Sequence, residues 1–148
     1  MVIVSGIDLL AKFYAGSDEV GRGKIEGRVV RFAKKYLFGE ERNAGELAVA
    51  LHAGFRNPIS HSFSLHSKTH RMTLISDGVD DGAIWRMRDD KNAFTVSLEG
   101  LFGAFIRAIH AYEADVRASA ELQANFEKMF EHYGAIKFNT YMVAAVRS

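Results

Sequence analysis

The sequence predicts a mainly α fold, a helical bundle with a small antiparallel β-meander inserted after the third helix. Apolar residues recur at intervals of three and four over most of the chain, the spacing that gives a helix one apolar face. Between residues 71 and 97 the interval changes to two, as expected of short strands. A length of 148 residues is that of one ordinary domain. We therefore expect one domain over residues 1–148, with the β insertion at 71–97.

Three helices are expected before the only proline of the chain. The first covers about residues 3–14, and the second runs from about Lys24 to Phe38, with Arg28 and most of its other basic residues facing solvent. The third runs from about Ala44 to Phe55. Pro58 interrupts it, because proline lacks the amide hydrogen of the helical bond and disfavours helix at the preceding residue.

The strands of the meander are expected at Arg71–Ser76, Ala83–Arg88 and Ala93–Ser97, separated by segments rich in Asp, Gly and Asn. Ser97 is the expected N-cap of the long helical pattern that follows. One helix over that whole pattern would be about 50 Å long. A break is therefore expected between Arg117 and Ala120.

Composition limits the class of protein. The chain is 48% hydrophobic and 25% charged, which is typical of a globular domain, and its net charge of +1 argues neither for nor against nucleic acid. No cysteine is present, which excludes disulfides, thiolate zinc sites and cysteine nucleophiles. The apolar start is interrupted by Asp8 and Lys12, so neither a signal peptide nor a membrane span is expected. A cytoplasmic location and no membrane partner follow as expectations.

The segment Arg56-Asn57-Pro58-Ile59-Ser60-His61 is the best candidate for chemistry. Asn57 is suited to cap a new helical turn that begins at Pro58, and this break aims Arg56 and His61 at one point. A guanidinium group matches phosphate geometry, and an imidazole exchanges protons near neutral pH. Together they are sufficient for metal-independent RNA cleavage in which the 2′-hydroxyl is the nucleophile.

The pattern Arg56-Asn57-x-x-x-His61 at a helix end resembles the signature of HEPN domains (higher eukaryotes and prokaryotes nucleotide-binding). Two helices before the motif, an insertion after it and Ser97-Leu98-Glu99 opening a long helix are also similar to that superfamily. The resemblance covers about Ile3 to Tyr133. It implies a helical homodimer whose two Arg and two His residues share one cleft for endoribonuclease activity. Many such domains are toxins or antiviral effectors, which would add an antitoxin as a partner.

The resemblance assigns the roles of the site. His61 is the expected acid and base, Arg56 binds the scissile phosphate, and Asn57 orients the pair. One helical turn before Arg56 many active members carry an acid, and this sequence departs from them with His52. Apart from the resemblance, Lys68 and Arg71 belong to a candidate basic patch beside the motif, and RNA contacts are expected of them and of His52.

Other interpretations of the same segments remain open. A catalytically inactive helical dimer is the alternative function, a binding or assembly module in which Arg56 and His61 only hold the helix break. His61, His66 and His70 match no compact zinc motif, so no metal and no cofactor are expected. The glycines between 21 and 27 lack the preceding strand and the Gly-Lys-Ser/Thr end of a phosphate loop. The aromatic residues after Ser97 are expected in the core or at a dimer seam.

Overall fold

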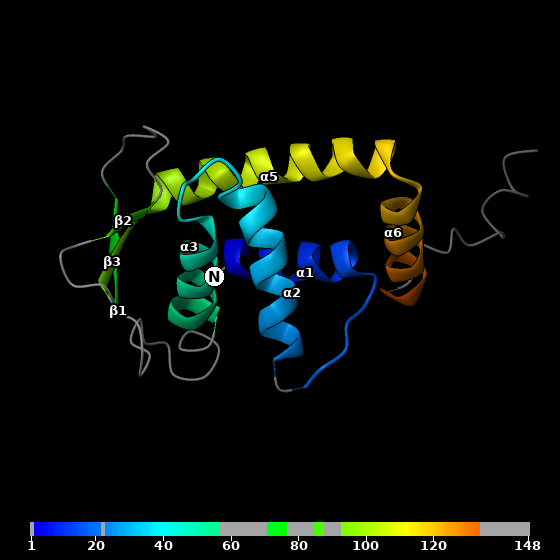
Figure 1. The fold of residues 1–148 in the computed structure, drawn as a ribbon, viewed down its shortest axis with the longest axis horizontal. Coiled ribbons are helices and arrows are strands. Elements are labelled where there is room, and N and C mark those ends of the chain that lie inside the picture. Colours follow the sequence, from blue (N-terminus) through cyan, green and yellow to red (C-terminus); the bar gives the residue numbers. More distant parts are fainter. Residues whose placement is uncertain (1, 22, 57–70, 77–84, 88–92, 134–148) are drawn as a thin grey trace, which may run out of the picture.

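The structure is a computed structural model that describes residues 2–21, 23–56, 71–76, 85–87 and 93–133. It confirms the mainly α fold class (Figure 1). Two of its helices continue into a π-helical segment, in which the backbone turn is wider than in an α-helix. The helical elements are α1 (Val2–Ala15), α2 (Lys24–Phe32) with η1 (Ala33–Leu37), α3 (Ala44–Leu51) with η2 (His52–Arg56), α5 (Leu98–Ala118) and α6 (Ala120–Tyr133).

The longest helix, α5, runs along the molecule, with the sheet at one end and α6 turning away at the other (Figure 1). In the same view α2 and α3 stand side by side and cross α1. Helix α1 contacts α2, α5 and α6, and η1 contacts α3 and α5. The core lies among these helices. Its largest fully buried side chains are those of Ile7, Phe32, Phe38, Leu51, Leu101, Val96 and Met129.

The expected helices are confirmed to within about one residue over the described ranges, and serines cap the starts of two of them. At the start of α5 the Ser97 hydroxyl accepts a hydrogen bond from the Gly100 amide at 3.1 Å. At the predicted break Ser119 has extended backbone angles, φ −123° and ψ 117°, which separate α5 from α6. Its hydroxyl accepts from the Leu122 amide at 3.3 Å. Both serines satisfy an amide that the first helical turn leaves without a partner.

The strands lie where the alternating pattern places them, at β1 (Arg71–Ile75), β2 (Trp85–Met87) and β3 (Ala93–Ser97). Their order is β1-β3-β2, with β1 parallel to β3 and β2 antiparallel to β3. The predicted antiparallel meander is therefore wrong. Alternation specifies which face of a strand is buried but not which strand is its neighbour. Phe94 and Val96 are both buried, consistent with the central place of β3.

One basic residue of α2 does not face solvent as expected. Arg28 is 3% exposed, and its guanidinium donates to the carbonyl oxygens of Glu19 at 2.9 Å and Ser17 at 3.4 Å. It also lies 4.0 Å from a carboxylate oxygen of Asp8. Arg28 thus holds the connection between α1 and α2, a role that requires burial.

Within the described ranges no helix has the length and apolar character that a bilayer-spanning segment needs.

Candidate functional site

The third helix ends in the π-helical turn η2, and the predicted motif begins at its last residue. The α-helical part stops at Leu51, and the wider turn then runs from His52 to Arg56. Such turns are rare and occur often at functional sites, because the extra residue redirects the side chains that follow. The helix therefore changes its geometry at His52, and Arg56 is the last residue of the wider turn.

His52 occupies the first position of η2, and its side chain lies inside the protein. It is 6% exposed, and the residues on either side, Leu51 and Ala53, are buried and half-buried. An imidazole with so little exposed surface has no face to offer an RNA strand. The expectation that His52 contacts RNA is corrected on this ground: the apolar face of α3 continues through His52 into the core.

The structure brings together the segments that carry three of the predicted residues. Strand β1, which begins at Arg71, contacts η2, which carries His52 and Arg56. The first residue of β1 pairs with Ala93 of β3, so the strand is fixed to the middle of the sheet. The remaining predicted site residues, Asn57, His61 and Lys68, lie outside the described residues.

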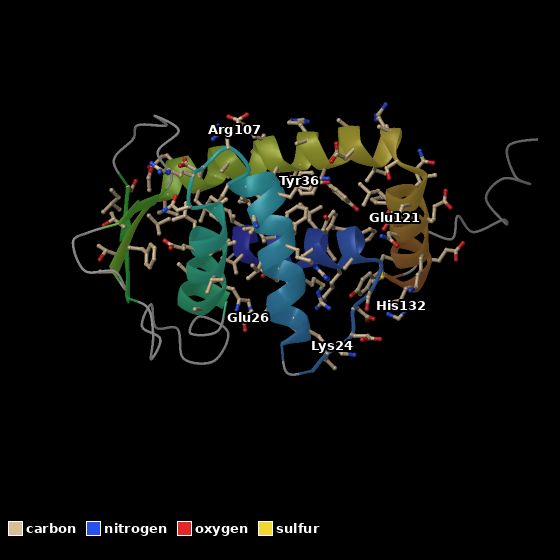
Figure 2. The ribbon with its side chains drawn as sticks, viewed as in Figure 1. Lys24, Glu26, Tyr36, Arg107, Glu121 and His132 are labelled. Carbon is tan, nitrogen blue, oxygen red and sulfur yellow. The ribbon has the colours of Figure 1, made fainter. Side chains whose placement is uncertain are left out.

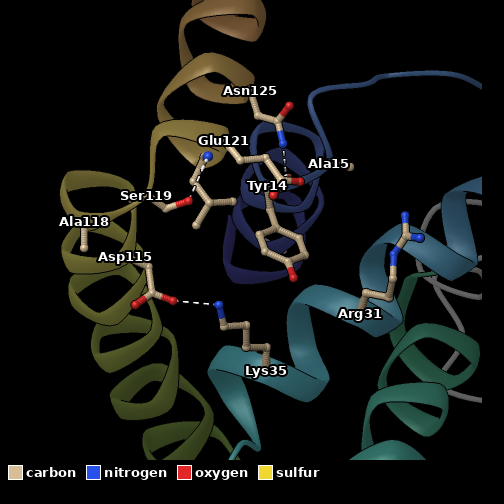
Figure 3. A pocket seen from close by; sticks show the side chains of 10 residues that line it. Tyr14, Ala15, Arg31, Lys35, Asp115, Ala118, Ser119, Glu121 and Asn125 are labelled. Atoms are coloured by element: carbon tan, nitrogen blue, oxygen red, sulfur yellow. Dashed lines mark hydrogen bonds and ion pairs between the residues drawn. The ribbon is translucent and has the colours of Figure 1, made fainter.

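A second candidate site lies at the other end of the molecule, where α1 and α5 end and α6 begins. It is a pocket of about 580 Å³ beside α2 and η1, a volume typical of small-molecule sites. Figure 3 shows its side chains arranged around Tyr14. The lining residues are Tyr14, Ala15, Arg31, Lys35, Asp115, Ala118, Ser119, Glu121, Leu122 and Asn125.

A network of charged and phenolic groups forms one wall of this pocket. The ammonium of Lys35 lies 2.7 Å from a carboxylate oxygen of Asp115, and the Tyr36 hydroxyl donates to the same oxygen at 2.9 Å. The hydrogen bond to Lys35 holds the pKa of Asp115 below its ordinary value, and that to Asp115 holds the pKa of Lys35 above its own. Lys35 is therefore a fixed cation at neutral pH and supplies no free amine for catalysis.

Aromatic rings surround the base of this network. Tyr14, Phe32, Tyr36 and Tyr112 contact one another, with ring centroids 5.0 to 6.3 Å apart. Tyr112 is buried, as expected of a core aromatic residue, and burial raises its pKa to about 12. Its hydroxyl has no hydrogen-bond partner among the described residues. No sequence pattern signals this cluster, because Tyr36 and Asp115 are 79 residues apart.

Neither site contains a recognisable metal centre within the described ranges, where no group of three His, Asp or Glu side chains comes together. The series His61, His66 and His70 lies outside those ranges.

Comparison with known proteins adds no relative, since no family model, no curated protein and no solved structure matches this chain. The function is therefore argued from the residues themselves.

Proposed function

We propose that this protein is a metal-independent endoribonuclease of the HEPN type, acting through Arg56, Asn57 and His61. The observation that carries the proposal is the position of the motif Arg56-Asn57-x-x-x-His61, which begins at the last residue of the π-helical turn of the third helix. The helix changes its geometry at His52, and a wider turn just before the motif favours an arrangement in which Arg56 and His61 converge on one ligand. Contact between η2 and the strand that begins with Arg71 places a further basic residue on a neighbouring element.

The proposed reaction is a transesterification. A base removes the proton of the 2′-hydroxyl, whose oxygen attacks the adjacent phosphorus and forms a 2′,3′-cyclic phosphate. The bond from phosphorus to the 5′-oxygen breaks, and an acid returns a proton to that oxygen. The His61 residues of two subunits divide these duties, Arg56 stabilises the charge that develops on the phosphate, and Asn57 orients the pair. No step requires a metal, so a chelator is expected to leave the rate unchanged.

The division of duties requires a homodimer in which the two motifs face each other across a two-fold axis. Exposed apolar side chains on α5 support self-association, because Leu98, Phe102 and Ile106 stand one helical turn apart and are 39%, 55% and 37% exposed. Light scattering at micromolar concentration is expected to give twice the mass of the chain. A monomer, or a dimer with the motifs on opposite outer faces, would remove the composite site.

A catalytically silent helical dimer remains the second candidate, and one observation favours it. His52 is buried one helical turn before Arg56, where active domains with a similar motif often carry an acid. A buried imidazole there suits a helix end that is stabilised by packing. In this case Arg56 and His61 hold the helix break and have no substrate.

Substitution of His61 separates the two candidates. If His61 transfers protons, His61→Ala lowers the rate of RNA cleavage by about 10²–10⁴-fold while the melting temperature stays close to that of the wild type. His110→Ala is the matched control, because His110 is an exposed histidine on α5 and no part of the motif. A His61→Ala protein that cleaves RNA at the wild-type rate disproves the catalytic assignment. One that melts early and cleaves in proportion to its folded fraction supports the silent module.

A further inference from the structure

The pocket beside α2 and α6 contains two opposite charges that have no partner among the described residues. Arg31 lines it from α2 and Glu121 from the first turn of α6. Both side chains are exposed, and neither forms an ion pair or a hydrogen bond with any described residue, including each other. Figure 3 shows them on different sides of Tyr14, and Figure 2 places Glu121 on α6.

The other charges of the pocket already compensate one another. Lys35 and Asp115 form the ion pair described above, with nearly equal exposures of 46% and 43%. Two cations and two anions therefore line the pocket, and its formal charge is zero. A neutral lining gives no net attraction for a simple anion such as phosphate, or for a simple cation. It matches a ligand that carries one charge of each sign.

The remaining lining residues suit the middle of such a ligand. Tyr14 contributes an aromatic side chain, and Ala15, Ala118 and Leu122 contribute small or apolar ones. The amide of Asn125 is fixed, because its nitrogen donates to the Tyr14 carbonyl oxygen at 3.1 Å. The pocket is therefore mainly polar in its lining, with a smaller apolar part, which suits a small ligand that is charged at both ends. Its volume of about 580 Å³ accommodates an amino acid or a dipeptide.

We propose that this pocket binds a small zwitterion, an amino acid or dipeptide, with its carboxylate on Arg31 and its ammonium on Glu121. The planar guanidinium makes two parallel hydrogen bonds to a carboxylate, and a glutamate accepts the hydrogens of an ammonium. The proposal does not depend on the RNase assignment, because Arg56 and β1 lie on other elements. A ligand here bridges α2 and α6, which otherwise meet through α1.

Titration with matched ligands tests both charged contacts. Phenylalanine and glycylphenylalanine serve as probes, together with their N-acetyl and C-amide forms, each followed by amide chemical shifts of the full chain up to about 10 mM. Shifts at residues of α2 and α6 are expected with at least one free zwitterion. Blocking either end is expected to weaken binding about tenfold or more, the usual effect of losing a hydrogen bond to a charged group. Inorganic phosphate is expected to give no shifts there.

Two substitutions assign the ends of the ligand. Arg31→Gln is expected to remove the preference for a free carboxylate over its amide, and Glu121→Gln the preference for a free amine over its N-acetyl form. Because both side chains are exposed, neither change disturbs the fold, which the same spectra confirm. Arg42→Gln and Glu127→Gln are the controls, since both residues are exposed and outside the pocket.

Three results would overturn the proposal. These are no response to any zwitterion at about 10 mM, equal binding of the free and end-blocked forms, and variants at Arg31 and Glu121 that keep the wild-type preferences. Cleavage activity enters none of these measurements. Failure of the zwitterion site is therefore distinguishable from failure of the RNase assignment.

Discussion

Two helices of this protein end in a π-helical turn, and the surroundings of the two turns differ. The exposed face of η1 carries Lys35 and Tyr36, which bind Asp115 of the neighbouring helix α5. The turn η2 begins with the buried His52 and ends with Arg56, the first residue of the predicted motif. The same kind of turn thus carries a charge network in one place and a buried histidine in the other. A π-turn alone does not identify a catalytic site, so the assignment at η2 depends on the Arg56-Asn57-x-x-x-His61 motif that begins at its last residue.

The largest difference is expected when the backbone of η1 itself is disturbed. A Cβ atom at Gly39 would fall inside the contact distance of the Lys35 carbonyl oxygen, which belongs to the turn. Gly39→Ala should therefore lower the free energy of unfolding by about 2–3 kcal/mol. Chemical denaturation measures the change. If Gly39→Ala has no effect on stability, the close approach of the chain to η1 is not rigid.

Gly45→Ala in α3 provides the control, because a Cβ atom there meets nothing within 4 Å. Alanine in place of glycine within a helix is expected to add about 0.5–1 kcal/mol of stability. The two substitutions introduce the same methyl group with opposite expected signs. Their difference isolates the steric constraint next to η1 from the general preference of helices for alanine.

The burial of His52 predicts the next largest effect, on the side of η2. His52→Ala should lower the free energy of unfolding by about 1–3 kcal/mol, because it removes a buried polar side chain and leaves a cavity. His110→Ala, which removes an exposed imidazole, should change it by no more than about 0.5 kcal/mol. RNA affinity of the folded His52→Ala protein should be unchanged. A loss of affinity without a loss of stability would restore the original assignment of His52 to RNA binding.

These comparisons also show which features the sequence predicts. The helices follow from apolar spacing within one segment, and Ser97 and Ser119 mark their ends through local hydrogen bonds. The partners of the strands depend on contacts between distant segments, so the parallel pairing of β1 with β3 was not predictable from alternation. The burial of Arg28 is equally non-local, since its partners lie on α1 and the connection after it.

The two candidate sites also differ in whether the sequence alone reveals them. The predicted motif is contiguous in sequence and needs no knowledge of packing, although the roles assigned to Arg56, Asn57, His61, Lys68 and Arg71 stay predictions. The pocket around Tyr14 is assembled from four helices. Its charged residues include Lys35 and Asp115, which no spacing rule connects. A contiguous motif is therefore visible in the sequence, whereas a site assembled by packing becomes visible only in the fold.

A smaller effect distinguishes Tyr36, which belongs to η1, from Tyr112, which contacts it from α5. The Tyr36 hydroxyl donates to Asp115, so Tyr36→Phe should lower stability by about 0.5–1.5 kcal/mol. The buried Tyr112 hydroxyl has no hydrogen-bond partner among the described residues, so Tyr112→Phe should be neutral or stabilising by up to about 1 kcal/mol. Denaturation at pH 7 compares the two variants. A loss of stability in Tyr112→Phe as large as that in Tyr36→Phe would mean that its hydroxyl is also bonded.

The stability of the protein at alkaline pH tests the burial of the Tyr112 hydroxyl. The folded protein raises the pKa of Tyr112 to about 12 from its ordinary value of 10.0. A raised pKa means that the neutral phenol is favoured by folding, so stability is present below pH 10 and is lost as the pH rises towards 12. Tyr112→Phe should remove part of this alkaline loss. An unchanged pH profile would show that Tyr112 ionises as easily in the folded as in the unfolded chain.

The smallest expected effect concerns Asp115, whose carboxylate binds Lys35 and Tyr36 of η1. Lys35 and Tyr36 lower the pKa of Asp115 below its ordinary value of 3.8. A lowered pKa favours the ionised form in the folded protein, so the stabilisation is present above the ordinary pKa and is lost as the pH falls through the lowered pKa.

Because Asp115 is 43% exposed, solvent screens the pair, and Asp115→Asn should cost no more than about 1 kcal/mol at pH 7. The cost should shrink as the pH falls from 3.8 through the lowered pKa, because the wild type then loses this stabilisation. Glu113→Gln on the same helix is the control, since its pair with Arg117 lies at the surface and joins residues only four apart. Denaturation of both variants at neutral and acidic pH measures the difference. If Asp115→Asn costs no more than Glu113→Gln at pH 7, the network does not tie η1 to α5, and the contrast between the two π-turns then depends on the burial of His52 alone.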